Sequence, residues 1–197
     1  TLNPAGMDLI AWREMGVPEW FAKKQLKLIR AYEKLGIKPS LTCAPYFFEN
    51  SPKFGEVVAF SESSAVIISN SLLGARTNRH GNLEALAAAI IGKVPKAGFL
   101  LDENRIPNVK ILVKDELNGH EYGLLGILVG RELKPNDVPI FHFRKKPSFN
   151  ELRILGAALA ASGALSLFHV ADTTPEALIN RNFREAGFEE KLTIDSK

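Results

Sequence analysis

Apolar residues recur along much of the chain at the three- and four-residue intervals of a helix, and elsewhere they gather in short runs typical of strands. The first helical pattern lies between Pro18 and Gly36, residues that favour the two ends of a helix. Residues 63–73 fit a buried helix and a strand equally well, because periodicity does not separate the two in a short apolar run. Further helices are predicted at residues 82–92, 121–133, 148–163 and 174–187. Strands are predicted at residues 40–46, 57–60, 97–101, 109–115, 138–143 and 164–172.

The starts of several predicted helices carry residues that favour helix termini. Ser148 is followed three residues later by Glu151, which is the spacing of a capping box. Asn82 is a favourable N-cap residue, and Thr174 followed by Pro175 fits an N-cap and a first helical position. Helices and apolar strands alternate, so the pattern predicts an α/β fold with a mainly parallel, covered sheet and no internal domain boundary.

The composition is that of a globular protein, because 46% of the 197 residues are hydrophobic and the formal net charge is only +3. Basic residues are scattered, apart from a run at residues 144–146 that predicts a solvated turn, so we expect no nucleic acid partner. Apolar runs stay below the ~18 residues of a membrane span, so we expect no membrane segment and a cytoplasmic location. The sequence contains no motif of a nucleotide-binding loop, a nucleophile elbow or a zinc-protease helix.

The stretch "NSLLGARTNRHG" (residues 70–81) is the most unusual polar segment. It places Arg76 and Arg79 three residues apart between Gly74 and Gly81, which allow backbone turns with exposed amides. Arginine pairs suit the capture of a carboxylate or phosphate, so one hypothesis is an anion-binding loop. The alternative is a surface loop whose arginines pair with neighbours such as Glu84.

Cys43 is the only cysteine, so the chain cannot form an intrachain disulfide. It lies at the end of a predicted strand, where it is either a buried inert thiol or a thiolate ligand or nucleophile. His142 and His169 lie in apolar strands and are predicted to be hydrogen-bonded core residues. We expect His120 to be solvated, whereas His80 adjoins the arginine loop.

Short polar clusters follow several apolar runs, at residues 53–56, 62–64 and 102–105. Each cluster is either an ordinary solvated loop or one wall of a ligand site. Their repetition after apolar runs favours a site, because ligands collect at strand ends in open α/β sheets.

The motifs "TCAPY", "PKFGEVVAFSESSAVIISNSLLGARTNR", "LDENR" and "GALSLFHVADTTPEA" resemble the large subunit of aconitase X, most densely over residues 42–105. The resemblance implies an aconitase-like layered α/β/α fold and an iron–sulfur cluster, of the 4Fe-4S type. It also implies a hydro-lyase. Archaeal members dehydrate (R)-5-phosphomevalonate to trans-anhydromevalonate 5-phosphate in a mevalonate pathway to isoprenoids, and bacterial members dehydrate cis-3-hydroxy-L-proline. The sequence of residues 40–60 resembles that of the archaeal members, so phosphomevalonate is the expected substrate.

The resemblance also implies roles for individual residues. Cys43 corresponds to a cluster ligand of the family, and Asn3 lies in an opening motif that faces the site. Arg76 and Arg79 are expected to anchor the carboxylate or phosphate of an anionic small-molecule substrate. Catalytic residues stay unassigned, and the general base is expected on a separate small swivelling subunit. The residues expected to line the substrate pocket are Ser63, Ser64, Asn70, Ser71, Arg76, Thr77, Asn78 and Arg79.

One departure from the family concerns the cluster. One thiolate cannot hold a cubane cluster, which needs at least three protein ligands. The family's large subunit is about twice this long and has its other cluster cysteines near its C-terminal end, so we expect this chain to be a central or proteolysed fragment of that subunit, or one piece of a split enzyme. We then expect no cluster and no activity in the chain alone, and partners in the remaining parts of the large subunit and the small subunit. The alternative is a non-catalytic domain that binds an anion or a partner.

Overall fold

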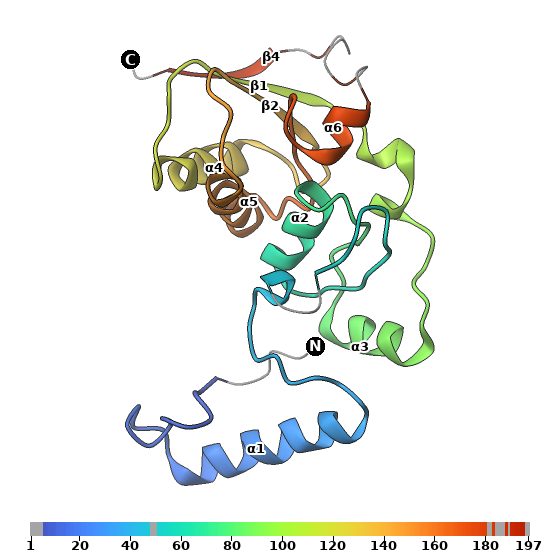
Figure 1. Cartoon of the computed structure of the whole chain (residues 1–197), viewed down its shortest axis with the longest axis vertical. Coiled ribbons are helices and arrows are strands. Elements are labelled where there is room, and N and C mark those ends of the chain that lie inside the picture. Colours follow the sequence, from blue (N-terminus) through green and yellow to red (C-terminus); the bar gives the residue numbers. More distant parts are fainter. Residues whose placement is uncertain (1–5, 48–50, 181–182, 184–187, 189, 196–197) are drawn as a thin grey trace. The chain divides into compact units, whose positions relative to one another are not determined.

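The chain, as a computed structural model, divides into two compact units that are described separately (Figure 1). Asn3 lies outside the described residues. None of the described helices combines the length and apolar character needed to span a bilayer. The units are Thr1–Ser51 and Pro52–Lys197, and the described residues are 6–47, 51–180, 183, 188 and 190–195.

The first unit is built on α1 (Glu19–Lys34), the helix predicted after Pro18. Its small core brings together Met7, Trp12 and Ala22. The strand predicted at residues 40–46 is wrong, because those residues are irregular and lead into the short 3-10 turn η1 (Pro45–Phe47). Pro45 lacks the backbone N–H that a strand ladder requires.

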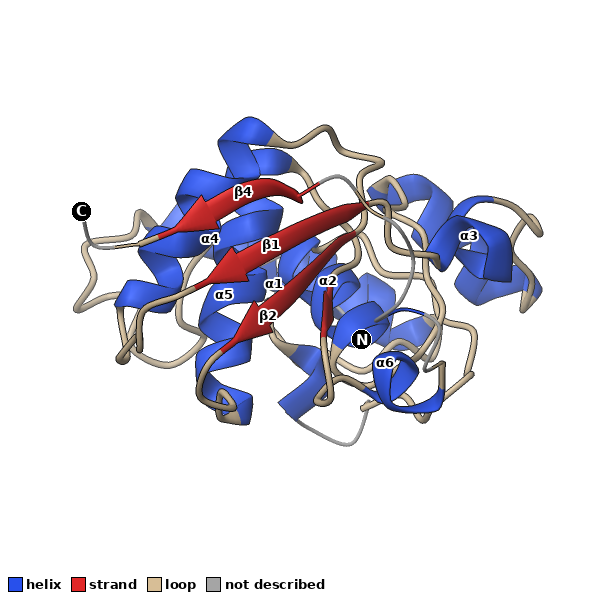
Figure 2. Cartoon of the chain, turned by 90° about the horizontal axis from the view of Figure 1, so that it is seen from above, coloured by secondary structure: helices blue, strands red, loops and turns tan. Residues whose placement is uncertain are grey.

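The second unit contains a four-stranded sheet in the order β3-β2-β1-β4. Every neighbouring pair is parallel, which confirms the predicted α/β class (Figure 2). Burial alternates along β1, where Val109, Ile111 and Val113 are buried and the intervening residues are half-exposed. The strands are β1 (Val109–Val113), β2 (Pro139–Phe143), β3 (His169–Val170) and β4 (Glu190–Ile194).

Two helices lie side by side on one face of this sheet (Figures 1 and 2). They are α4 (Glu121–Glu132) and α5 (Phe149–Gly163), and α5 begins with the predicted Ser148–Glu151 capping box. The helix α4 is continuous through its three glycines. A Cβ on Gly130 would lie 2.1 Å from the Ser162 Oγ of α5, so this glycine allows the two backbones to approach closely.

The remaining helices of the second unit are shorter. Residues 63–73 prove to be helical, since α2 (Ser63–Ser71) packs against α5. The helix α3 (Asn82–Ile91) ends at Gly92 as predicted, but its N-cap is Gly81 and not Asn82. The helix α6 (Pro175–Ile179) has the predicted Thr174 N-cap and ends earlier than expected, and most of the later predicted residues lie outside the described ones.

Three predicted strands are reduced or absent because other groups take their backbone hydrogen bonds. Residues 57–60 form only isolated bridges with the arginine loop. The segment 97–101 is a 3-10 turn, in which the Asn78 side chain accepts from the Phe99 N–H and donates to the Ala97 carbonyl. Residues 164–172 keep only the two residues of β3 as a strand.

Candidate functional site

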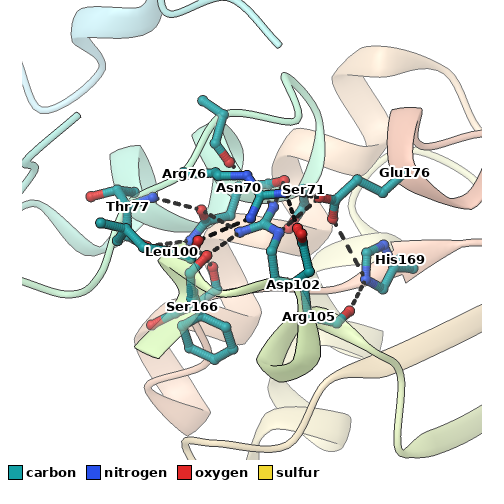
Figure 3. Close-up of polar contacts among 12 residues, drawn as sticks. Asn70, Ser71, Arg76, Thr77, Leu100, Asp102, Arg105, Ser166, His169 and Glu176 are labelled. Carbon is teal, nitrogen blue, oxygen red and sulfur yellow. Dashed lines mark hydrogen bonds and ion pairs between the residues drawn. The ribbon is translucent and has the colours of Figure 1, made fainter. Parts of the chain in front are cut away.

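Arg105 lies at the centre of a buried polar cluster in the second unit (Figure 3). It ends the 3-10 turn η3 (Asp102–Arg105) and is only 2% exposed. All five of its N–H hydrogens are used, so no donor remains for a ligand. Its Nε donates to Glu176 Oε1 at 2.7 Å, Nη1 donates to Asn70 Oδ1 and the Phe99 carbonyl, and Nη2 donates to the carbonyls of Asn70 and Ala75.

Arg76 is held at the edge of the same cluster and is less completely bonded. Its Nη1 donates to the Leu100 carbonyl at 3.0 Å, and its Nη2 is paired with the carboxylate of Asp102. The Oε1 atom of Glu176 lies 4.0 Å from Nη2. Its side chain is 23% exposed, and within the described part of the chain its other N–H groups have no recorded acceptor. Arg76, and not Arg105, is therefore the arginine that has donors available for an anion.

The turn after α2 explains why Arg76 reaches this position. Gly74 has φ +66°, a conformation that side chains disfavour, and a Cβ there would lie 2.3 Å from the Phe54 ring. This glycine lets the chain turn back, so that Arg76 pairs with Val57 in a parallel bridge. Gly81 has φ −68°, so the second glycine of the motif is not required by its backbone conformation.

Asn70, Thr77 and Ser71, three residues of the predicted pocket, bind the protein's own backbone. Asn70 Oδ1 accepts from the Thr77 N–H at 3.0 Å, and its Nδ2 donates to the carbonyls of Thr77 and Ser166 at 2.8 and 2.9 Å. Ser71 Oγ accepts from the Phe168 N–H at 2.9 Å. These side chains therefore fix the arginine loop and the segment before β3 relative to α2.

The two arginines of the motif differ in their surroundings. Arg76 and Asn78 both contact the turn at residues 97–102, whereas Thr77 contacts Asn70 on the other side. Arg79 is exposed, and its backbone bridges Phe60, whereas that of Arg76 bridges Val57.

Ser63 and Ser64 are the first residues of α2 and are half-buried. Seven residues of helix separate Ser63 from Asn70, about 10 Å along the axis at 1.5 Å per residue. The structure therefore places these two serines at the opposite end of α2 from the cluster. Their contact with substrate stays a prediction.

Two buried histidines, His80 and His169, each contact a partner within the protein. His169 Nε2 lies 2.9 Å from the Arg105 carbonyl, which confirms the predicted bonded core histidine. Burial lowers the pKa of His169 from 6.5 to about 4, so it is neutral at neutral pH. His80 Nδ1 lies 3.0 Å from Glu84, and this hydrogen bond lowers the pKa of the Glu84 carboxyl. Glu84 thus pairs with His80 and not with the loop arginines.

Glu176 and Asp102 are site residues whose roles the sequence did not reveal. Glu176 is in the first turn of α6 and is buried, so its carboxylate faces both arginines from an element 100 residues away in the sequence from Arg76. A glutamate near the start of a helix is already explained by its favourable interaction with the helix dipole, so the sequence gives no signal for a further role. Asp102 stood only within an undifferentiated polar cluster.

Cys43 belongs to the first unit and is exposed, so the alternative of a buried, inert thiol is wrong. Among the described residues no group of three or more His, Cys, Asp or Glu side chains is arranged to hold a metal ion. A cubane cluster needs at least three protein ligands. The described residues therefore do not fit a complete iron–sulfur site.

The second unit is an α/β domain with a parallel sheet, in which the buried Arg105 lies in the same polar cluster as the partly accessible Arg76. Family comparison gives the particular class: the chain belongs to the aconitase X family. The model of the aconitase X first domain matches residues 1–103, and the model of the second domain matches residues 107–197.

Several relatives resemble the chain over nearly its whole length. The phosphomevalonate dehydratase large subunit of Methanosarcina mazei is 49% identical, covering 98% of the chain and 48% of the relative. That of Methanothermobacter thermautotrophicus is 48% identical, covering 100% of the chain and 48% of the relative. The cis-3-hydroxy-L-proline dehydratase of Pseudomonas aeruginosa is 39% identical, covering 90% and 31%.

A solved structure confirms the fold. The crystal structure of Thermococcus kodakaraensis aconitase X (holo-form) matches with a TM-score of 0.79 and 44% identity, over 90% of the chain and 44% of that protein. The chain spans about half the length of the phosphomevalonate dehydratase large subunits that it matches.

Proposed function

We propose that the chain forms part of the large subunit of a phosphomevalonate dehydratase. This hydro-lyase would remove water from (R)-5-phosphomevalonate to give trans-anhydromevalonate 5-phosphate. The supporting observation is the similarity over the whole chain, 48–49% to two large subunits of that name against 39% and 36% to two cis-3-hydroxy-L-proline dehydratases. The name "large subunit" of these relatives supports a small-subunit partner. A cytoplasmic location stays a prediction from composition.

Arg76 is the residue that we propose to anchor the anionic end of the substrate. Its guanidinium is partly accessible, while Arg105 beneath it is saturated and rigidly bonded. A fixed arginine with free N–H groups orients a carboxylate or phosphate without paying to order its own side chain. The other predicted pocket residues near it, Asn70, Ser71 and Thr77, would then act by holding the loop that carries Arg76.

The cofactor implied by the family is an iron–sulfur cluster, which supplies a Lewis acid to a leaving hydroxyl when it is bound. Within this proposal Cys43 supplies one thiolate ligand, and other parts of the complete enzyme supply the rest. Because the described residues do not fit a complete cluster site, we assign them binding and orienting roles only.

The test is an assay of the complete enzyme, with the whole large subunit and the small subunit. We expect water loss from (R)-5-phosphomevalonate, measured by mass spectrometry of the product, and a much lower kcat/KM with cis-3-hydroxy-L-proline. Preference for the proline would replace the proposed substrate by the alternative one. Turnover of neither substrate by a cluster-loaded enzyme would favour a non-catalytic anion- or partner-binding domain.

A further inference from the structure

Asp102 competes with an external anion for Arg76, because it occupies one donor of the guanidinium while other donors stay available. Its carboxylate is paired with Arg76 Nη2 (Figure 3), although the Asp102 side chain is 85% exposed. It begins the short 3-10 turn η3, whose last residue is the firmly bonded Arg105. An exposed carboxylate in an ion pair contributes little to stability, so Asp102 can leave Arg76 at small cost.

The charges around Arg76 are balanced while Asp102 stays in place. The guanidiniums of Arg76 and Arg105 face the carboxylates of Asp102 and Glu176, and His169 is neutral because burial depresses its pKa. Glu176 is buried and bound to Arg105 at 2.7 Å, so it cannot move aside. Only the departure of Asp102 gives the site a net positive charge for an incoming anion.

We propose that Asp102 is an internal competitor for Arg76, which rests on the function proposed above: its carboxylate holds Arg76 in the ligand-free enzyme, and a phosphate dianion displaces it more readily than a monocarboxylate does. A monocarboxylate offers Arg76 the same group that Asp102 already presents, and Asp102 is tethered at a high effective concentration. A phosphate ester carries about −1.5 to −2 charges and three acceptor oxygens, so it competes better for a guanidinium.

The experiment measures anion binding by calorimetry on the complete two-subunit enzyme, with inorganic phosphate and acetate as probes at neutral pH. The wild-type enzyme should bind phosphate more tightly than acetate. Asp102→Asn removes the competing charge but keeps the shape of the side chain. We expect it to strengthen the binding of both acetate and phosphate, by about two- to fivefold, because both then bind Arg76 without displacing a carboxylate. Asp102→Ala should behave in the same way.

Glu103→Gln is the matched control, because Glu103 is exposed in the same turn and its change removes the same charge. It should leave the Kd values of both probes close to those of wild type. Weaker binding of both probes to Asp102→Asn would overturn the proposal, since it would mean that Asp102 positions Arg76. Kd values for Asp102→Asn equal to those of wild type and Glu103→Gln would also overturn it. Calorimetry needs no turnover, so an enzyme inactive on phosphomevalonate would contradict the proposed function without deciding the role of Asp102.

Discussion

Arg76 and Arg105 carry the same side chain, yet their surroundings give them different tasks. Arg105 donates all of its N–H hydrogens to acceptors from Asn70, Ala75, Phe99 and Glu176, so its role is to join segments of the fold. Arg76 is tied at two points and keeps further donors at a partly exposed edge. Residue type alone therefore does not separate a structural arginine from a binding one.

Replacing Arg105 should damage the fold more than any surface arginine. Arg105→Ala would leave the buried carboxylate of Glu176 without its guanidinium, and breaking such a pair costs about 3–5 kcal/mol. Urea unfolding of the complete enzyme or its large subunit measures this loss. Arg144→Ala, in the exposed basic run, is the control and should change the free energy of unfolding by no more than about 0.5 kcal/mol. Equal stability of the two variants would contradict the structural role of Arg105.

Replacing Arg76 should impair function and leave the fold intact. In the complete enzyme Arg76→Ala should lower kcat/KM about a hundredfold or more, because it removes a charged contact to substrate. Its structural partner Asp102 is exposed, so denaturation should change little. Arg131→Ala, exposed in the last turn of α4, is the control for loss of charge. A kcat/KM close to that of wild type would reject the anchoring role.

The buried His169 should make stability depend on pH. The folded protein keeps it neutral with a pKa of about 4, whereas the unfolded chain binds a proton near pH 6.5. The free energy of unfolding keeps its full value above that pH and falls by about 3 kcal/mol as the pH falls toward 4, because the unfolded chain then binds a proton that the folded protein does not bind. Unfolding curves of wild type and His169→Gln between these pH values measure it. Carboxyl groups titrate in the same range, so the decisive quantity is the difference in the free energy of unfolding between the two proteins. Parallel pH curves for the two proteins would contradict the assignment.

At the level of secondary structure, the contact between α4 and α5 depends on glycine. Gly126 and Gly130 of α4 face α5, and a Cβ on Gly126 would lie 2.6 Å from the Cβ of Ala158. Gly163 meets the Gly130 carbonyl in the same way, at 2.3 Å from its hypothetical Cβ. This helix pair lies on one face of the sheet, so its spacing fixes how the sheet is covered (Figure 2).

Adding one methyl group at this contact should destabilise the domain. Gly130→Ala forces the helix backbones apart, and overpacking of this kind costs about 1–3 kcal/mol despite the better helix propensity of alanine. Gly123→Ala is the matched control on the same helix, because its added Cβ meets only the movable Ile154 side chain at 3.3 Å. Thermal unfolding should show a lower Tm for Gly130→Ala alone. A similar Tm for both variants would contradict the close backbone contact.

At the level of the whole molecule, the number of cluster ligands decides whether the chain alone can hold an iron–sulfur cluster. The chain has one cysteine, and its described residues hold no group of three or more metal-ligating side chains. We therefore expect the purified 197-residue chain, after anaerobic reconstitution with iron and sulfide, to retain far less than one cluster per chain. The complete enzyme treated identically should retain a stoichiometric cluster. Iron and sulfide analysis measures both, and a stoichiometric cluster on the chain alone would contradict this prediction.

Sequence patterns were reliable where local interactions decide the structure. The capping box at Ser148, the αL glycine at Gly92 and the parallel strands around Ile111 were all confirmed. The motifs of residues 42–105 and 163–177 identified the aconitase X family, which the family models confirm. Each of these features depends on residues close in the sequence, or on the pattern of a whole motif, so it can be predicted from the sequence.

Only the tertiary structure decided which polar groups meet. Asn70 and Ser71 bind the backbone of Ser166 and Phe168, 96 and 97 residues away, and the segment before β3 therefore does not form the predicted longer strand. Arg105 likewise finds Glu176 71 residues further along the chain. A buried polar group must be paired, but its residue type does not say with what. The sequence by itself thus determined the local elements, the family and the presence of an arginine-rich loop, while the long-range pairing of buried donors and acceptors decided which arginine supports the fold and which can meet a ligand.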